Sequence, residues 1–330
     1  MIARDAYNGR QVLITGGLGF LGSNLAIRLV ELGAQVTIVD SVVPQFGGNF
    51  FNIEPVRDRV ALNISDMRDA NSLDILVRDK DYIFNLAGQV SHGDSMRDPQ
   101  LDLAVNCVST MNLVEACRQH NPHARLLYTS TRQVYGRPQA LPVAEDHPTV
   151  PIDVNGINKL AAEYYHLLYH RTYGVRCTVL RLTNTFGPRQ RIQSDRQGFA
   201  AVFVRQALCG DTIRLYGGGL QLRDFNYVDD VVNAMVLAAS SDACLGQVYN
   251  LGSPRAHSLV DFVDILKSLC SFDVEVVPFP EDKRIIDIGD YYGDFSKFRR
   301  TTGWTAQVAL GDGLARTVAY YRQHQEVYWQ

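Results

Sequence analysis

Residues 11–22 of the 330-residue chain read QVLITGGLGFLG, and this stretch decides the fold. A short β-branched run stops at glycines and is followed by apolar residues at helical spacing. The glycines of the turn are three residues apart: Gly16, Gly19 and Gly22. Glycine permits a tight turn, and the start of the following helix directs free N–H groups at an anion. The stretch therefore predicts a strand, a phosphate-binding turn and a helix.

A second predicted strand follows this helix and ends in an acidic residue. The segment AQVTIVD, residues 34–40, places Asp40 after a β-branched run. A carboxylate at this point accepts hydrogen bonds from the ribose hydroxyls of a dinucleotide. It would repel a 2′-phosphate, which favours NAD over NADP.

The same alternation continues through the first half of the chain. Buried strands are predicted in DYIFNLAG (81–88), ARLLYTST (124–131) and VRCTVLRLTN (175–184), with helices over 101–120 and 154–173 between them. Strands that alternate with helices imply right-handed crossovers and a parallel sheet covered on both faces. We therefore expect an α/β fold with a Rossmann-type doubly wound parallel sheet.

The pattern changes near residue 186. A polar loop leads to mixed elements, including helices near 198–209 and 229–239 and strands in GQVYNLG (246–252) and VEVVPFP (274–280). This order predicts a smaller mixed α/β lobe. We expect an NAD-binding domain over 1–185, to which parts of 225–255 return, and a substrate lobe over 186–330, with a cleft between them.

Composition excludes several classes of protein. With 46% hydrophobic and 20% charged residues and a net charge of −3, the chain has the make-up of a globular protein and no basic surface for nucleic acid. The six cysteines are scattered without metal-ligand spacing, so reduced thiols and no metal are expected. The polar start and the lack of an apolar run of about 20 residues predict a cytoplasmic protein with no membrane partner.

Several motifs in order now resemble one family. TGGLGFLG (15–22), NISDMRD (63–69), NCVSTMNLVEA (106–116), YTSTRQVYG (128–136), RLTNTFGP (181–188) and LQLRDFNYVDD (220–230) are similar to those of the extended short-chain dehydrogenase/reductase family, specifically its nucleotide-sugar epimerases and dehydratases. The resemblance covers almost the whole chain and implies NAD as cofactor. It assigns these residues to the cofactor: Gly16, Gly19, Phe20, Leu21, Gly22, Asp40, Asp66, Met67, Leu86, Ala87, Gly88, Asn106 and Lys159.

The resemblance also implies a nucleotide-diphosphate sugar as substrate, with UDP as the family's commonest carrier. The substrate residues that it implies are Gln89, Ser91, Asn184, Arg189, Arg223 and Arg284. A guanidinium such as that of Arg223 suits a diphosphate because it makes planar bidentate bonds. Arg191 and Arg196 crowd the same loop as Arg189 and are expected either to touch the diphosphate or to be solvated. The family usually forms homodimers through the helices near 101–120 and 154–173.

The catalytic helix departs from the family pattern. Thr131 and Lys159 match the family's Ser/Thr and Lys, but Asn155 stands four residues before Lys159, where a Tyr is usual. Asn cannot accept a proton near neutral pH. The base could come from elsewhere, with His92 in GQVSHGDS (88–95) as the best titrating candidate. Other candidates are Tyr135 and a Lys159–water–Thr131 relay; Tyr164 and Tyr165 are expected to face away. A catalytically weak binding protein, or an Asn introduced by engineering, are the competing hypotheses.

The residues after Thr131 bear on the reaction. The family's 4,6-dehydratases carry Thr-Asp-Glu here, whereas this chain has Thr131, Arg132 and Gln133. The missing acids argue against a dehydratase and, less strongly, against a decarboxylase. An epimerase is therefore the leading hypothesis, with a 4-epimerase as the default. Arg132 would bind a substrate carboxylate, as on a uronic acid, or lower the pKa of a substrate hydroxyl, or form a structural ion pair.

Overall fold

The computed structural model describes residues 4–193 and 198–329. Its centre is a 7-stranded parallel sheet with the order β10-β6-β5-β4-β1-β2-β3. The strands are β1 (Gln11–Thr15), β2 (Gln35–Asp40), β3 (Val60–Ile64), β4 (Tyr82–Asn85), β5 (Arg125–Thr131), β6 (Arg176–Leu182) and β10 (Val248–Asn250). The predicted Rossmann-type α/β fold is confirmed.

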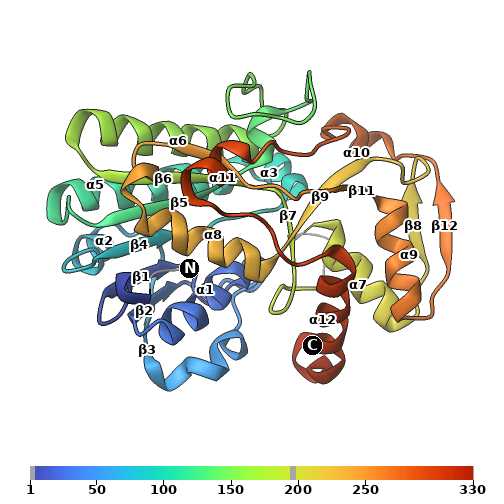
Figure 1. The fold of residues 1–330 in the computed structure, drawn as a ribbon, viewed down its shortest axis with the longest axis horizontal. Coiled ribbons are helices and arrows are strands. Elements are labelled where there is room, and N and C mark those ends of the chain that lie inside the picture. Colours follow the sequence, from blue (N-terminus) through green and yellow to red (C-terminus); the bar gives the residue numbers. More distant parts are fainter. Residues whose placement is uncertain (1–3, 194–197, 330) are drawn as a thin grey trace.

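Helices cover both faces of this sheet (Figure 1). On one face α1 packs beside α8, and on the other α5 packs between α2 and α6. These helices are α1 (Phe20–Glu31), α2 (Ala70–Leu76), α5 (Ser109–His120), α6 (Val154–Tyr173) and α8 (Val228–Ser240). Strand β10, which follows α8, pairs with β6 at the edge of the sheet. A late segment of the chain thus completes the first sheet.

The predicted helix over 101–120 has three parts. α4 (Pro99–Asp102) leads into the π-helical turn η4 (Leu103–Val108), which continues as α5. A π-turn widens a helix locally and often lies at a functional site. Here it faces α6, the other helix of the same layer.

The ends of α6 follow from local chemistry. The side chain of Asp153 caps the N-terminus by accepting a hydrogen bond from the Gly156 N–H at 2.6 Å. Gly174 ends the helix in the left-handed region with φ 73°. The predicted helix over 154–173 is confirmed.

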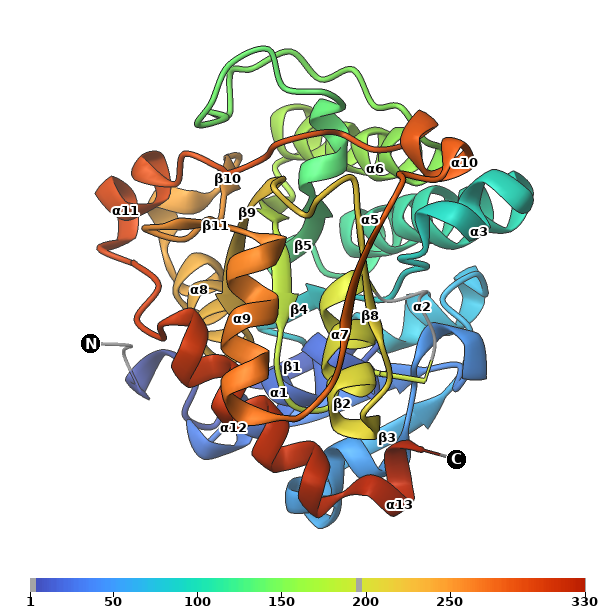
Figure 2. The same ribbon diagram turned by 90° about the vertical axis from the view of Figure 1, so that its right-hand side faces the viewer.

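The second lobe is smaller and mixed (Figure 2). A 3-stranded sheet has the order β11-β9-β7, and β12 pairs in parallel with β8. Its elements are β7 (Asn184–Phe186), β8 (Ile213–Tyr216), β9 (Leu222–Tyr227), β11 (Ala256–Ser258), β12 (Val274–Val277), α7 (Phe199–Cys209), α9 (Leu259–Leu269), α10 (Glu281–Ile285) and α12 (Leu310–Gln323). Phenylalanine rings, including those of Phe186, Phe225 and Phe262, pack between the sheet and these helices.

Short elements complete the fold. They are η1 (Arg4–Ala6), η2 (Pro44–Phe46), η3 (Phe50–Arg59), α3 (His92–Arg97), η5 (Arg132–Tyr135), η7 (Asp242–Cys244), α11 (Ser296–Thr302) and α13 (Gln325–Tyr328). Among the described residues, none of the helices combines the length and the apolar character needed to cross a bilayer.

Candidate active site

One large cavity, with a volume of about 1100 Å³, joins the two lobes. Its walls include the carboxyl ends of the first sheet and residues of β7, β8, β9 and the loop after α10. In parallel α/β sheets ligands bind outside the carboxyl ends of the strands. The cavity therefore lies where the fold leads one to expect a ligand.

The glycine turn forms one end of this cavity and has no room for side chains. A Cβ added to Gly22 would lie 2.2 Å from the Gly16 carbonyl oxygen, and one added to Gly16 would lie 2.9 Å from the Ala87 backbone. Gly16 also has φ +67°. Helix α1 begins after Gly19 with no side-chain cap, so its first N–H groups stay available to a phosphate.

Acidic residues line the wall next to this turn. The Asp40 carboxylate is fixed by hydrogen bonds from the backbone N–H groups of Leu18 and Val42, and burial raises its pKa. Asp66 lies beside Met67 and pairs with Arg68 at 2.6 Å. Of the predicted cofactor residues, the cavity is lined by Gly16, Gly19, Phe20, Leu21, Gly22, Asp40, Asp66, Met67, Leu86, Ala87, Gly88 and Lys159.

Asn106 is placed differently from the other predicted cofactor residues. It does not line the cavity but lies behind the wall, where its side chain makes two hydrogen bonds to the Gln89 backbone. A Cβ at Gly88 would approach its Oδ1 to 2.7 Å. Asn106 is therefore a positioning residue that fixes the strand-end loop after β4.

The structure brings Thr131 and Lys159 together in the cavity wall. Thr131 ends β5, and its Oγ1 accepts a hydrogen bond from the Gln133 N–H. The Lys159 ammonium donates to the Thr129 carbonyl at 2.7 Å and lies 4.5 Å from the centre of the Tyr128 ring. Burial lowers the pKa of Lys159 to about 8, although the charges of Asp102 and Glu163 act in the opposite direction.

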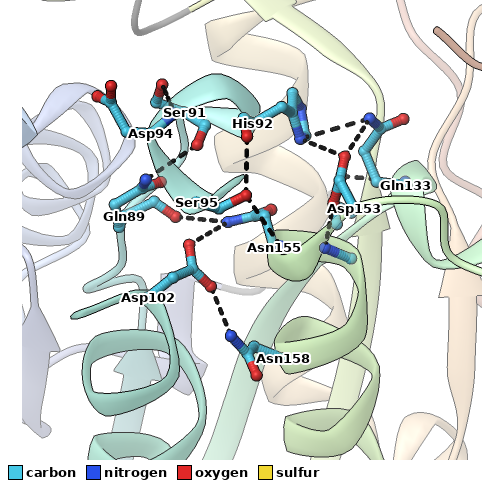
Figure 3. Close-up of polar contacts among 12 residues, drawn as sticks. Gln89, Ser91, His92, Asp94, Ser95, Asp102, Gln133, Asp153, Asn155 and Asn158 are labelled. Atoms are coloured by element: carbon cyan, nitrogen blue, oxygen red, sulfur yellow. Dashed lines mark hydrogen bonds and ion pairs between the residues drawn. The ribbon is translucent and has the colours of Figure 1, made fainter. Parts of the chain in front are cut away.

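Asn155 also reaches the cavity wall but is 3% exposed, and its amide nitrogen makes two hydrogen bonds. Its amide nitrogen donates to the Gln89 carbonyl at 2.9 Å and to Asp102 Oδ2 at 3.2 Å, as Figure 3 shows. Its backbone N–H donates to the hydroxyl of Ser95. Asn158, one turn later, donates to Asp102 Oδ1 at 2.8 Å. Asn155 thus serves as a structural donor at the position of the usual Tyr.

A histidine–aspartate pair lies next to this position. His92 lines the cavity, and its Nδ1 is 3.0 Å from Oδ2 of Asp153, the cap of α6 (Figure 3). Gln133 Nε2 donates to the same carboxylate oxygen at 3.0 Å. Burial raises the pKa of Asp153, but hydrogen bonds from His92, Gly156 and Gln133 outweigh it, and the pKa lies below its usual value. The carboxylate is therefore ionised and holds the Nδ1–H tautomer, which leaves His92 Nε2 as an acceptor.

Two arginines lie in the wall that the second lobe shares with β5. Arg223 of β9 donates to the carbonyls of Leu222 and Gly289, and its Nη2 is 3.8 Å from Asp287 Oδ2. Burial and the charge of Arg132 lower the pKa of Arg223 to about 10. Nearby, Asn184 lines the cavity and donates to the Asp224 carbonyl at 2.9 Å. Gln89 and Ser91, two more predicted substrate residues, line the cavity on the side of α3.

Two predicted substrate residues lie elsewhere. Arg189 does not line the cavity, because its guanidinium turns back to the Asn52 carbonyl and to Asn24 Oδ1. Arg284 is exposed on α10 and pairs with Glu281 one turn away. In this structure neither side chain lines the cavity, and a role of either in substrate binding stays a prediction. Arg191 does not line the cavity either, and Arg196 lies outside the described residues.

None of the three tyrosines considered as a base lines the cavity, and Tyr164 and Tyr165 were expected to face away. Tyr135 is buried outside the cavity and bonds to Asn250 and Arg181, and Tyr164 is exposed on α6. Tyr165 does not line the cavity. Of the candidates with a side chain that titrates, His92 and Lys159 remain at the cavity.

The residues present fit a dinucleotide. The cradle at Gly16 and Gly22 excludes a Cβ, as a pyrophosphate site requires. Several buried polar atoms of the cavity wall have no hydrogen-bond partner within the described part of the chain: Gln89 Oε1, Ser130 Oγ, Arg132 Nε and Gln133 Oε1. Such atoms are costly unless a ligand or water pairs with them. No cluster of three potential metal ligands occurs among residues 4–193 and 198–329.

Fold and site together define a Rossmann-type dinucleotide-binding protein with a second lobe that presents the buried Arg223 to the same cavity. The chain belongs to the NAD dependent epimerase/dehydratase family, whose model matches residues 12–252. The extended short-chain dehydrogenase/reductase resemblance is thereby confirmed, and NAD is the cofactor of the family.

Relatives within this family catalyse different reactions. The chain is 33% identical to a UDP-glucose 4-epimerase of Mycolicibacterium smegmatis over 94% of this chain and 98% of the relative. It is 32% identical to UDP-glucuronic acid decarboxylase 1 of Xenopus tropicalis over 96% and 73%. The solved structure of a Thermotoga maritima UDP-glucose 4-epimerase with UDP-glucose has a TM-score of 0.87 at 29% identity, covering 96% of this chain and 99% of that one.

Proposed function

We propose that this protein is an NAD-dependent nucleotide-sugar epimerase that inverts C4 of its sugar and uses His92 as its acid/base. The observation that carries the proposal is His92, which pairs with Asp153 and lines the cavity that Thr131, Lys159 and the glycine cradle also line. Relatives at similar identity that are named UDP-glucose 4-epimerase support the choice of carbon and of UDP.

The chain's own residues supply binding and proton transfer. The chemistry that bound NAD would supply is reversible hydride transfer with a sugar carbon. The glycine turn, the start of α1 and Asp40 would hold the pyrophosphate and the ribose. His92 Nε2 takes the proton of the sugar hydroxyl as the ketone forms and gives it back on reduction. The Asp153 carboxylate keeps the imidazole oriented and stabilises its positive charge.

Lys159 can act in binding and catalysis without a neighbouring Tyr. Its ammonium is anchored on the Thr129 carbonyl and retains two further N–H donors for ribose hydroxyls. Its positive charge also favours an alkoxide at the adjoining sugar carbon. Thr131 offers a hydroxyl to the same region of the cavity.

Elimination and decarboxylation are less well supported. A 4,6-dehydratase needs an acid and a base at C5 and C6, yet Arg132 and Gln133 occupy the two positions after Thr131. Asp153 does not line the cavity, because it is buried beside His92 and engaged by three donors. A catalytically weak nucleotide-sugar binding protein is the alternative, and it predicts binding without turnover.

The assembly is also a proposal. Apolar side chains are exposed on α6 at helical spacing, namely Ile157, Tyr164 and Leu168, and Leu103 and Val108 are exposed on η4. Since α6 contacts η4, these residues belong to adjoining elements of one layer. We propose that this face forms a homodimer.

Product analysis tests the proposed reaction. Purified protein with NAD is incubated with UDP-, dTDP-, GDP- and CDP-linked sugars, and NMR identifies the products. A C4 epimer of one substrate is the expected result. A product that has lost water or CO₂ would replace the proposal with a dehydratase or decarboxylase, and binding without any conversion would favour the weak binding protein.

A further inference from the structure

Arg132 is a half-buried cation at the cavity wall, and no ion pair or hydrogen bond joins its side chain to a residue that the structure describes. Its guanidinium lines the cavity, and its Nε is shielded from solvent without a partner. The contact that it makes is to the ring of Tyr291, whose centre lies 5.8 Å from the guanidinium carbon. A shielded N–H of a cation without an acceptor is disfavoured, so an anionic ligand group in the cavity is the natural partner.

The acidic residues near Arg132 are engaged with other groups. Asp224 is fully buried, and its oxygens accept from the Thr183 hydroxyl and the Gly293 N–H. Asp287 lies near Arg223, and Asp153 is occupied by His92. The negative charges of these carboxylates raise the pKa of Arg132, but burial has the larger effect and lowers it. The side chain still carries its charge at neutral pH.

Tyr291 makes the position of Arg132 rigid. The tyrosine is 1% exposed, its N–H donates to the Leu222 carbonyl at 3.0 Å, and it forms a β-bridge with Arg223. The ring beneath Arg132 is thus attached to the strand that carries Arg223. The two cations lie close enough for Arg132 to lower the pKa of Arg223. Two such cations in one wall indicate either that the ligand has two anionic groups or that both arginines bind the same anionic group.

The sequence neighbours of Arg132 belong to the part of the site where we expect the sugar. Thr131 precedes it at the end of β5, and Gln133 follows it and donates to Asp153 of the proposed acid/base pair. Arg223 instead belongs to the second lobe, beside Asn184. Arg132 is therefore adjacent in sequence to residues of the proposed reaction centre, whereas Arg223 is adjacent to residues proposed to bind the diphosphate.

We infer that Arg132 binds a carboxylate on the sugar, so that the substrate is a nucleotide-linked sugar acid. This inference rests on the proposed function. A guanidinium and a carboxylate make two parallel charge-assisted hydrogen bonds in a low-dielectric site. The same cation could instead share the substrate diphosphate with Arg223, and the experiment must separate these two sources of negative charge.

Binding of matched ligands to NAD-loaded protein makes this separation. UDP, UDP-glucose and UDP-glucuronic acid share a nucleotide, and the two sugars differ only in the carboxylate at C6. UDP-galactose and UDP-galacturonic acid form a second pair. Each ligand is titrated by calorimetry against wild type, Arg132→Met and Arg223→Met, with Arg255→Met as the control, since Arg255 is exposed and away from the cavity.

Wild type should bind one acid at least about tenfold more tightly than its neutral partner, as a hydrogen-bonded charge pair provides. Arg132→Met should abolish this ratio, whereas Arg223→Met should weaken UDP and every UDP-sugar alike. Equal weakening of UDP and both sugars in Arg132→Met would assign Arg132 to the diphosphate and overturn the inference. The inference would also be overturned if wild type bound UDP but bound each neutral sugar more tightly than the matching acid. If wild type binds neither UDP nor any UDP-sugar, UDP as the carrier in the proposed function is wrong. The titrations are then repeated with dTDP-linked acid and neutral sugars, and the ratio of their affinities decides the inference.

Discussion

The side-chain amide of Asn155 donates to Oδ2 of Asp102 at 3.2 Å, inside a region where both residues are buried. Asn158 donates to the other oxygen of the same carboxylate. The two asparagines therefore have one physical role, since each supplies a donor to a buried acid. A Tyr at 155 would offer at most one donor and could not span Asp102 and the Gln89 carbonyl.

This relationship predicts that Asn155→Tyr does not create a better enzyme. A Tyr hydroxyl has one donor where the amide has two, so Asp102 or the Gln89 carbonyl loses its partner and stability should fall by about 1–3 kcal/mol. Turnover should stay the same or fall. Urea unfolding and steady-state kinetics measure the two effects.

Asn158→Leu is the matched control for this variant. It removes the other donor to Asp102 but does not line the cavity. It should lose about 1–3 kcal/mol of stability while the folded protein keeps its turnover. A gain in turnover of tenfold or more in Asn155→Tyr would contradict a substitute base.

The second prediction concerns the acid/base pair. His92→Asn should lower kcat by about 10²–10⁴ with a smaller change in KM, because it removes the proton acceptor. His123→Asn, an exposed histidine away from this cavity, should leave kcat unchanged. Normal turnover in His92→Asn would exclude His92 as the base.

The variant Asp153→Asn separates two roles of Asp153, which are to orient the His92 ring and to cap helix α6. Asn caps a helix about as well as Asp, so the start of α6 should survive and the unfolding midpoint should change little. The amide would donate to Nδ1 and force the proton onto Nε2, so kcat should fall as in His92→Asn. Asp153→Ala should lose both stability and kcat. Full activity in Asp153→Asn would limit Asp153 to its capping role.

Much of this site could be predicted from local patterns. The glycine turn, Asp40, Thr131 and Lys159 follow from strand ends and helix starts, which sequence marks clearly. The edge strand β3 and helix α2 were not predicted, because Val60–Ile64 alternates between half-buried and exposed positions and carries a weak apolar signal. Arg189 and Arg284 do not line the cavity in this structure, and a sequence does not show which way a long side chain turns.

Asp153 and Asp102 show two kinds of omission. Asp153 precedes the predicted helix at 154, so its capping role had a sequence signal that was not used. Its contact with His92, 61 positions earlier by their numbers, depends on how α3 packs on α6. Asp102 had no signal at all, because the donors that satisfy it come from a helix more than fifty residues away.

The third prediction tests the glycine cradle. Gly22→Ala places a Cβ 2.2 Å from the Gly16 carbonyl, so the turn must move. NAD affinity should fall by tenfold or more, and stability should fall by about 1–3 kcal/mol. Gly311→Ala is the control, since it also lies in the first turn of a helix and its Cβ meets nothing nearer than 4.0 Å.

Gly311→Ala should be neutral or stabilise the protein by up to about 1 kcal/mol, with unchanged NAD binding. Fluorescence titration with NAD and thermal unfolding measure both variants. Unaltered NAD affinity in Gly22→Ala would show that the turn does not hold the pyrophosphate.

The fourth prediction concerns the apolar face of α6. Leu168→Glu puts a charge in the proposed interface and should convert dimers to monomers, which sedimentation velocity detects. Val276→Glu, at an exposed position of β12, should leave the assembly unchanged. A wild-type protein that sediments as a monomer at micromolar concentration would refute the proposed dimer.

The fifth prediction follows from the buried ammonium of Lys159. Burial lowers its pKa from 10.5 to about 8 in the folded protein, whereas the unfolded chain keeps a value near 10.5. Between these values the unfolded state binds more protons, so the stability of wild type relative to Lys159→Met should rise with pH, by up to about 1.4 kcal/mol per pH unit. Below about pH 7 the difference should be constant. Urea unfolding of both proteins without NAD, from pH 6.5 to 10, measures it. Parallel curves would mean that the ammonium is hydrated, and its role in fixing the cofactor ribose would then need a different account.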